Sequence, residues 1–158
     1  MFLIDGTLHW SASDLTASAE CEFAVLRTLD YKLGWADPID VASDPLQVHI
    51  AALGDRHEER LLRRWQEEGD VVVLPHLEPP YSAASLAEAA AASAAALATD
   101  AQMVYQAAFF DGEFFGYADF VERADDGWCV CDAKLARSAK PKALLQLGAY
   151  ADQLRALG

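Results

Sequence analysis

Two aspartates and a lysine near the end of the chain have the residue types and spacing of a metal-dependent site for phosphate chemistry. Asp132 follows Asp119 by 13 positions. That separation is natural for two strands joined by a tight turn, so the two carboxylates can lie side by side. Adjacent, partly buried carboxylates repel each other unless a proton or a cation lies between them. A hard cation such as Mg²⁺ or Mn²⁺ takes oxygen ligands and keeps waters, one of which can attack a phosphodiester.

Three further residues extend this candidate site. Lys134 lies two positions after Asp132, so in a strand both side chains point to the same face and the ammonium can reach the phosphate or the attacking water. Gln146 and Tyr150 are four positions apart, on one face of a predicted helix. Each feature alone has an ordinary explanation, as a solvated strand aspartate, a chance Asp-x-Lys or a helix surface. Their order and spacing together favour a site.

The composition is that of a single globular domain of 158 residues with an acidic surface. Hydrophobic residues make up 53% and charged residues 23%, which excludes a disordered chain. The net charge of −13 argues against a free-standing nucleic-acid binder, because such proteins usually show a basic surface. It does not exclude a nuclease whose active site binds cations, and it indicates that another segment or partner holds the polynucleotide.

The sequence also limits the location of the protein. No apolar run approaches the roughly 20 residues that span a bilayer, and the first residues, MFLIDGTLHWSASDL, do not form a signal peptide. We therefore expect a cytoplasmic protein with no membrane contact. Cys21, Cys129 and Cys131 are an odd number of cysteines, so a disulfide framework is not expected.

The first half of the chain is predicted to be mainly helical. Ser13 and Asp14 offer N-caps for a helix that runs to about Leu33. In the helix expected from Gly54, the leucines and the tryptophan are buried and the Glu and Arg residues stay exposed. The remaining expected segments are a strand or arm within residues 1–12, a loop over 34–53 with a short helix as an alternative, a strand at 71–74 and an alanine-rich helix at 82–99.

The second half is predicted to form a three-stranded meander followed by a helix. The expected strands are Met103–Phe110, Phe114–Arg123 and Trp128–Asp132, and Asp111-Gly112 is a hairpin turn signal. The expected helix covers Ala143–Leu157. The fold class is therefore α/β, with a mixed, mainly antiparallel central sheet flanked by helices. The aromatic residues of the first hairpin are expected in the core, and His9, His49 and His76 on the surface.

Four motifs together resemble the RecB-like branch of the PD-(D/E)XK nuclease superfamily. They are Gly54-Asp55-Arg56-His57, Gly116-Tyr117-Ala118-Asp119, Asp132-Ala133-Lys134 and Gln146-Leu147-Gly148-Ala149-Tyr150. The segment SASDLTASAEC also resembles the entry helix of these proteins. The resemblance extends from Ser11 to Tyr150 and its combination of motifs is specific, although each motif alone is degenerate.

The resemblance implies a restriction-endonuclease-like core that hydrolyses DNA phosphodiester bonds in DNA repair or recombination, alongside a helicase domain or subunit. It implies Mg²⁺ or Mn²⁺ bound by His57, Asp119, Asp132 and the backbone carbonyl of Ala133. It also implies a catalytic set of Asp119, Asp132, Lys134, Gln146 and Tyr150. Without the downstream motifs, His57 would be read as a cap or as a partner of Glu58 or Glu59.

Besides its acidic net charge, the chain departs from the family pattern in two ways. Some members bind an iron–sulfur cluster through one N-terminal and three C-terminal cysteines, but no trio follows Tyr150, so no cluster is expected here. The chain ends directly after the last predicted helix, where the family core continues into a strand. We therefore expect residues 1–158 to be one nuclease domain from a longer protein. The alternative is a non-catalytic module that guides DNA or supports a larger helicase–nuclease protein. The choice between DNA and RNA stays open.

Overall fold

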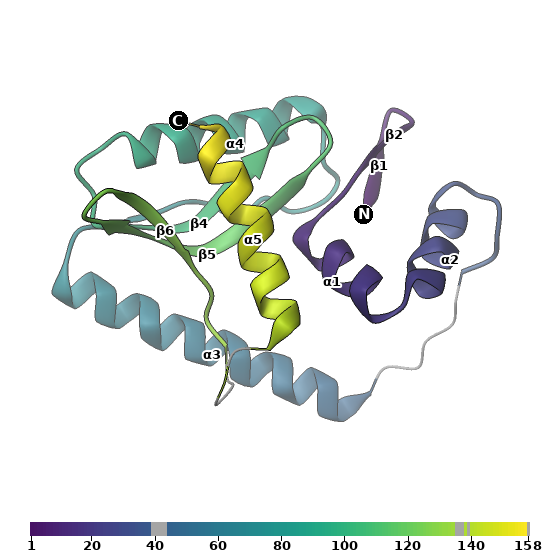
Figure 1. Ribbon diagram of the computed structural model, residues 1–158, viewed down its shortest axis with the longest axis horizontal. Helices are drawn as coiled ribbons and strands as arrows, with labels where there is room; N and C mark the ends of the chain where they lie inside the picture. The colour runs from purple at the N-terminus through teal and green to yellow at the C-terminus, as the bar shows by residue number, and fades with distance from the viewer. Residues whose placement is uncertain (39–43, 135–137, 139, 158) are drawn as a thin grey trace.

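A four-stranded mixed sheet forms the centre of the fold (Figure 1). The computed structural model describes residues 1–38, 44–134, 138 and 140–157. The strand order is β3-β4-β5-β6, with β3 parallel to β4 and the other neighbours antiparallel. These strands are β3 (Val71–Val73), β4 (Met103–Phe110), β5 (Phe115–Ala124) and β6 (Gly127–Cys131). The predicted α/β class, with a mixed and mainly antiparallel sheet, is confirmed.

A short hairpin turn sets the register between β4 and β5. The Asp111 carboxylate accepts hydrogen bonds from the backbone N–H groups of Glu113 at 2.9 Å and Phe114 at 2.7 Å. Gly112 has φ = +100°, a conformation that costs glycine little and most other residues much more. The turn predicted at Asp111-Gly112 is therefore confirmed, and it fixes which residues of the two strands are opposite each other.

Five helices accompany the sheet in the part of the chain that is described. They are α1 (Ala12–Glu20), α2 (Glu22–Lys32), α3 (Pro45–Glu68), α4 (Ala83–Leu97) and α5 (Pro141–Ala156). Leu86 of α4 packs with Ala108 and Phe115, whereas Tyr150 of α5 packs on Gly116, the next residue along β5. Because successive strand residues point to opposite faces, α4 and α5 cover opposite faces of the sheet. Figure 1 shows α3 as a long rod below the sheet, beside the N-terminal end of α5.

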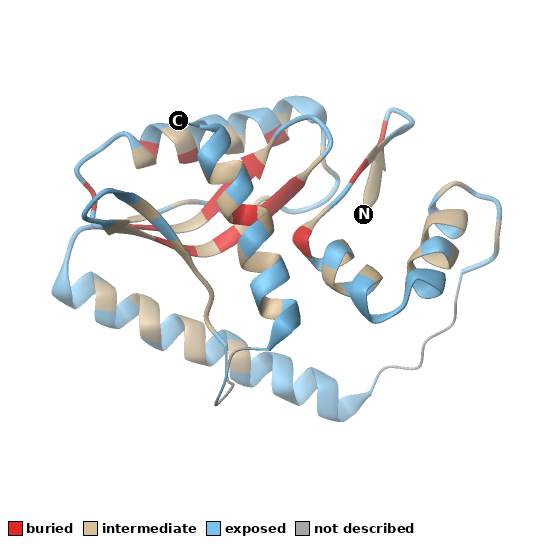
Figure 2. Ribbon diagram, viewed as in Figure 1, coloured by how far each residue is buried: buried red, intermediate tan, exposed pale blue. Residues whose placement is uncertain are grey.

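The hydrophobic core lies between the sheet and helices α4 and α5 (Figure 2). Its fully buried residues include Val104, Ala107 and Val121 on the two central strands. The hairpin aromatics predicted to be in the core divide into two groups. Phe109, Phe115 and Phe120 are buried, and Phe110, Phe114 and Tyr117 are half-buried. The prediction of a core role, rather than a base-stacking platform, agrees with this packing.

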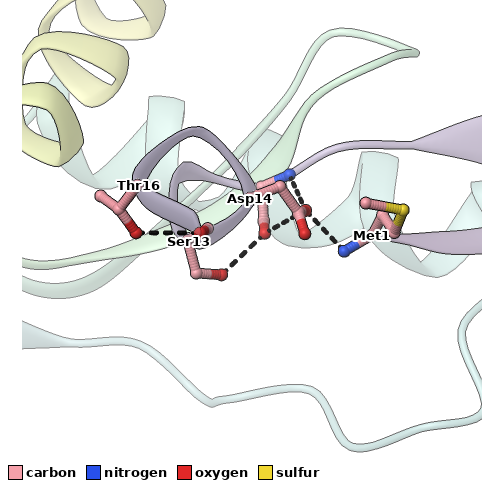
Figure 3. Close-up of polar contacts among 5 residues, drawn as sticks. Met1, Ser13, Asp14 and Thr16 are labelled. Carbon is pink, nitrogen blue, oxygen red and sulfur yellow. Dashed lines mark hydrogen bonds and ion pairs between the residues drawn. The ribbon is translucent and has the colours of Figure 1, made fainter. Parts of the chain in front are cut away.

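The N-terminal arm is a small hairpin followed by a capped helix. Strands β1 (Phe2–Ile4) and β2 (Thr7–His9) are joined by Asp5 and Gly6, both with positive φ, as a two-residue hairpin turn requires. The N-cap of α1 is Ser11, not Ser13 or Asp14 as predicted. Asp14 is instead the third residue of the helix, and its Oδ2 accepts from the Ser11 backbone, the Ser11 hydroxyl and the Met1 ammonium (Figure 3).

The single helix predicted from Ser13 to Leu33 is wrong, because the chain leaves helical geometry at Cys21. That residue has an extended backbone with φ −160° and ψ 98°, and it lies between the end of α1 and the start of α2. Helix α1 packs along α5, whereas α2 carries no buried residue. The break therefore lies between a helix that packs on α5 and one with no buried residue, and no glycine or proline marks it in the sequence.

Helix α3 begins nine residues earlier than the expected helix at Gly54. Asp44 is its N-cap, with Oδ1 accepting from the Leu46 backbone N–H at 2.9 Å, and Pro45 occupies the first helical position. Asp44-Pro45, within the segment expected to be a loop, is thus a helix start. The expected burial of Leu61, Leu62 and Trp65 is only partial, since α3 has no fully buried residue.

The exposure of the histidines differs from the expectation at His9. His9 was expected at the surface but is only 3% exposed. Its ring stacks on Phe2 at 5.4 Å and lies 5.6 Å from Phe110, because β2 folds back onto the core. His49 and His76 are exposed as expected.

No helix within the described ranges combines the length and apolar character needed to cross a bilayer.

Candidate active site

The sheet register brings the two predicted aspartates together. The last pair of the β5–β6 ladder is Phe120 with Cys131, so one further step places Asp132 opposite Asp119. Asp119 lies on β5 between two buried residues, Ala118 and Phe120. Its Oδ2 accepts a hydrogen bond from the Ala133 backbone N–H at 3.3 Å. The predicted side-by-side arrangement of the carboxylates therefore follows from ordinary strand pairing.

The surroundings of Asp119 favour its protonated form. Burial raises the pKa of this carboxyl to about 7, helped by a hydrogen bond shared with Asp132 and by the negative charges of Glu58 and Asp132. The Ala133 N–H acts in the opposite direction but does not compensate. Two carboxyl groups that raise each other's pKa at this distance are also placed to share a cation.

Asp132 has one oxygen paired and the other without a partner. Its side chain is 8% exposed, and its Oδ1 lies 2.9 Å from the Lys134 Nζ. Its buried Oδ2 has no hydrogen-bond partner among the described residues. Leaving a buried carboxylate oxygen unpaired is costly, and an oxygen ligand for a cation is the simplest use for it. Lys134 itself is half-exposed, so its ammonium remains accessible to a substrate phosphate.

Glu58 of α3 is a third carboxylate at this site, although the Glu residues of its helix were expected to stay exposed. The Glu58 Oε1 accepts hydrogen bonds from the Tyr105 hydroxyl and the Gln106 amide, each at 2.8 Å. Glu58 is half-buried rather than exposed. The signal that could have revealed it is its spacing of four and seven residues from Leu62 and Trp65, which places all three on one helix face.

A backbone distortion in β4 makes the Glu58 contacts possible. Gln106 has φ = +58°, unusual for a residue other than glycine, and its position in the register is opposite Asp119. Successive strand side chains normally point to opposite faces. The left-handed conformation at Gln106 lets both Tyr105 and Gln106 reach the same carboxylate. Burial, followed by the hydrogen bond to Glu58, raises the pKa of Tyr105 to about 12, so this phenol stays a donor.

A cleft of about 520 Å³ lies beside Asp119 and Glu58, between α3, α5, the middle of β5 and the segment that follows β6. Asp132 is not among its lining residues. It is lined by residues of both helices and of the sheet, among them Gly54, Asp55, Glu58, Asp119, Ala133, Lys134 and Gln146. His57 is half-buried and is not among the lining residues. The helix that carries the Gly-x-x-His motif therefore does reach the site, but it presents Glu58 to the cleft, and the role of His57 as a metal ligand stays a prediction.

Tyr150 lies beneath the site rather than in the cleft. It is 7% exposed, and burial together with the charge of Asp119 raises its pKa to about 12, against hydrogen bonds with Gln146 and the Tyr117 backbone. Its ring packs on Gly116, where an added Cβ would lie 2.8 Å from the Tyr150 hydroxyl oxygen. The glycine of the Gly-x-x-Asp motif is therefore needed for close packing of α5, while Gln146 faces the cleft.

The donor atoms at this site are carboxylate oxygens, which suit a hard cation such as Mg²⁺ or Mn²⁺. The partnerless Oδ2 of Asp132 and the adjacent Asp119 carboxyl fit such an ion. Across the described ranges, no three His, Cys, Asp or Glu side chains already converge as a complete ligand set. A cation bound here would need backbone oxygens, waters or substrate oxygens as its other ligands.

The remaining sequence-based candidates contribute less. Arg137 follows Lys134 in the sequence and could contact phosphate or stay solvated, but it lies outside the described residues. Cys129 is exposed and Cys131 half-buried, and both are free thiols. Of the two, only Cys131 packs within the fold, and its thiol lies 3.7 Å from the Glu122 carboxylate.

Comparison with protein-family models, curated proteins and solved structures gives no match for this chain.

Proposed function

We propose that this chain is a metal-dependent nuclease that hydrolyses DNA phosphodiester bonds. The single observation that carries the proposal is the pair of carboxyl groups on neighbouring strands. One buried oxygen of Asp132 has no partner among the described residues, and the Lys134 ammonium lies 2.9 Å from the other. This arrangement supplies two ligands for a cation and a positive group for the phosphate. The order of motifs supports the RecB-like PD-(D/E)XK class and a restriction-endonuclease-like core.

Each residue of the site has a defined task in this reaction. Asp119 and Asp132 would hold Mg²⁺ or Mn²⁺, and the ion would supply an activated water and neutralise charge on the phosphate oxygens. Lys134 contacts the scissile phosphate and stabilises the charge that develops on it. Gln146 hydrogen-bonds to the site from the cleft wall, and Tyr150 positions Asp119 from below. Glu58, fixed by Tyr105 and Gln106, adds negative charge that strengthens cation binding.

Cleavage assays test this proposal directly. The purified chain is incubated with labelled single- and double-stranded DNA, and with RNA, in Mg²⁺, in Mn²⁺ and in EDTA. We expect metal-dependent cleavage of DNA, a loss of at least about 100-fold in Asp132→Ala and Lys134→Ala, and wild-type activity in Asp126→Ala. Asp126 is a matched control because it is an exposed aspartate in the β5–β6 turn. Equal activity in the wild type and both site variants would contradict the proposal.

A second candidate is a non-catalytic module of a larger helicase–nuclease protein. The observation that favours it is that the described residues hold no ready group of three metal-ligating side chains, while Lys134 already neutralises Asp132. Calorimetric titration separates the two. The non-catalytic role is preferred if millimolar Mg²⁺ or Mn²⁺ gives no binding heat and if His57→Ala and Asp132→Ala give the same titration as the wild type. Under either function we place the protein in the cytoplasm, in DNA repair or recombination.

A further inference from the structure

Three lysines line the cleft beside the carboxylates, and they differ in what they contact. Lys134 is paired with Asp132 at 2.9 Å. Lys140 and Lys142 come from the start of α5 and line the same cleft with Gln146. Lys142 is paired with Glu20 of α1, with 2.7 Å between Nζ and Oε1, and Lys140 makes no ion pair with any described residue. Lys140 and Lys142 are thus two cationic side chains of the cleft that are not paired with the Asp119–Asp132 carboxyl groups.

The charge balance of the cleft gives these lysines a task. A nucleic-acid strand that enters the cleft meets Asp55, Glu58 and Asp119, in a protein whose net charge is −13. A bound cation and Lys134 can neutralise only the phosphate that is being cut. The next phosphate along the strand needs its own positive partner, because an uncompensated phosphate would be repelled by this wall. Within the described lining of the cleft, Lys140 and Lys142 are the remaining cationic residues.

Glu20 occupies the position of a competing anion. It is the last residue of α1, and its carboxylate bonds to Lys142 in a contact where both side chains are more than half exposed. A solvent-exposed ion pair of this kind is weak and easily exchanged. A phosphate oxygen can therefore replace the Glu20 carboxylate on Lys142 without breaking the packing between α1 and α5.

We propose that Lys140 and Lys142 bind the phosphate adjacent to the scissile one, and that Glu20 competes with the nucleic acid for Lys142. This inference rests on the proposed function, since it names the strand-binding residues of the same cleft. It also gives the acidic chain cationic contacts of its own at the cleft, so that nucleic-acid binding does not depend wholly on another segment or partner.

The test measures binding without hydrolysis. A short fluorescein-labelled oligothymidylate is titrated with the whole chain in Ca²⁺, and anisotropy is followed at several salt concentrations. We expect Lys140→Gln and Lys142→Gln each to raise Kd about 3- to 10-fold. Each substitution should also reduce the slope of log K against log salt by about 0.7. Glu20→Gln should lower Kd about 2- to 5-fold, because Lys142 is released.

The opposite signs keep this test independent of folding. Damage to the structure would weaken binding in all three variants, whereas the proposal requires Glu20→Gln to strengthen it. Lys32→Gln is the matched control, since Lys32 is exposed at the end of α2 beside Tyr31 and outside the cleft. Unchanged or weaker binding by Glu20→Gln would overturn the proposal, as would lysine variants that behave like Lys32→Gln or a wild type that does not bind.

A parallel cleavage assay in Mg²⁺ or Mn²⁺ distinguishes failure of this inference from failure of the proposed function. If the wild type cuts DNA but Lys140→Gln and Lys142→Gln leave KM unchanged, the nuclease function stands and the phosphate site is wrong. If nothing is cut but the binding changes have the expected signs, Lys140 and Lys142 bind a backbone phosphate in the cleft and the catalytic proposal is wrong.

Discussion

At the scale of single residues, Asp119 shows how much a strand position can change an ordinary carboxyl group. In the sequence it is an aspartate in an apolar strand. In the fold it lies between buried neighbours and opposite Asp132, and burial raises its pKa to about 7. A buried carboxyl group with a raised pKa lowers the free energy of unfolding when it ionises near neutral pH. Such a cost to stability is common at functional sites. Its energetic effect can be measured without any substrate.

We predict that Asp119→Asn stabilises the metal-free protein. A carboxyl whose pKa is raised on folding stabilises the fold below its unfolded pKa, near 4, and this contribution is lost as the pH rises towards about 7. The gain from Asn should therefore be small at pH 4 and on the order of 1 kcal/mol at pH 8, or about 2–4 °C in Tm. Thermal unfolding in EDTA at both pH values measures it.

Asp126→Asn is the control for this experiment, because Asp126 is exposed and should leave Tm unchanged at both pH values. Saturating Mn²⁺ should reverse the order, since the wild type then gains binding energy that Asp119→Asn has lost. If Asp119→Asn is less stable than the wild type in EDTA at pH 8, the ionised Asp119 carboxylate does not destabilise the fold.

At the scale of elements, the contact between β5 and α5 determines where Asp119 lies relative to Gln146. We predict that Gly116→Ala destabilises the protein by about 1–3 kcal/mol, because its Cβ would lie 2.8 Å from the Tyr150 hydroxyl oxygen. In a Tyr150→Phe background, which removes that oxygen, the cost should fall. Chemical denaturation of the four proteins in a double-mutant cycle measures the coupling. Equal costs in both backgrounds would mean that the hydroxyl is not what Gly116 accommodates.

A second element contact joins α4 to the open side of β4. Strand β3 pairs only with Met103–Tyr105, so the backbone N–H of Ala108 donates instead to the Ser93 hydroxyl at 2.7 Å. Ser93 is fully buried. We predict that Ser93→Ala leaves this N–H unsatisfied and lowers the free energy of unfolding by about 1–3 kcal/mol. Urea denaturation checks the value, with Ser18→Ala in α1 as the control, and a loss no larger than the control's would contradict it.

At the scale of the whole molecule, helix α3 is the least embedded part of the site. It contributes Glu58 to the carboxylates, yet it has no fully buried residue. Apolar side chains in its first half, including Leu46, Val48 and Ile50, are more than half exposed. Strands β4 and β5, by contrast, hold most of the buried core (Figure 2). The site is therefore built across two regions of unequal stability.

This difference predicts the pattern of amide hydrogen exchange. Amides of α3 should exchange by local opening, at least about tenfold faster than those of β4 and β5, because few buried contacts hold the helix down. Mn²⁺ should slow exchange around Glu58, since binding that uses the site suppresses openings that dismantle it. Mass spectrometry of peptides from the two regions measures both effects. Equal protection in α3 and β4 without metal would show that the helix is held more firmly than its burial indicates.

The local sequence determined the meander, its turns, the alanine-rich helix and the last helix to within two residues. Those elements follow from strand propensity, hairpin signals such as Asp111-Gly112 and helix propensity, all of which act over a few neighbouring residues. The proximity of Asp119 and Asp132 also follows from the local sequence, because a tight turn between β5 and β6 determines which of their residues are paired.

The tertiary structure decided the features that depend on contacts between distant segments. The break at Cys21 depends on packing of α1 against α5, and the burial of His9 depends on how the N-terminal hairpin folds back. The presence of Glu58 in the site depends on how α3 is rotated against β4, which the left-handed conformation of Gln106 accommodates. A helix sequence gives the relative positions of its side chains, but only the packing partner determines which of them meets Asp119.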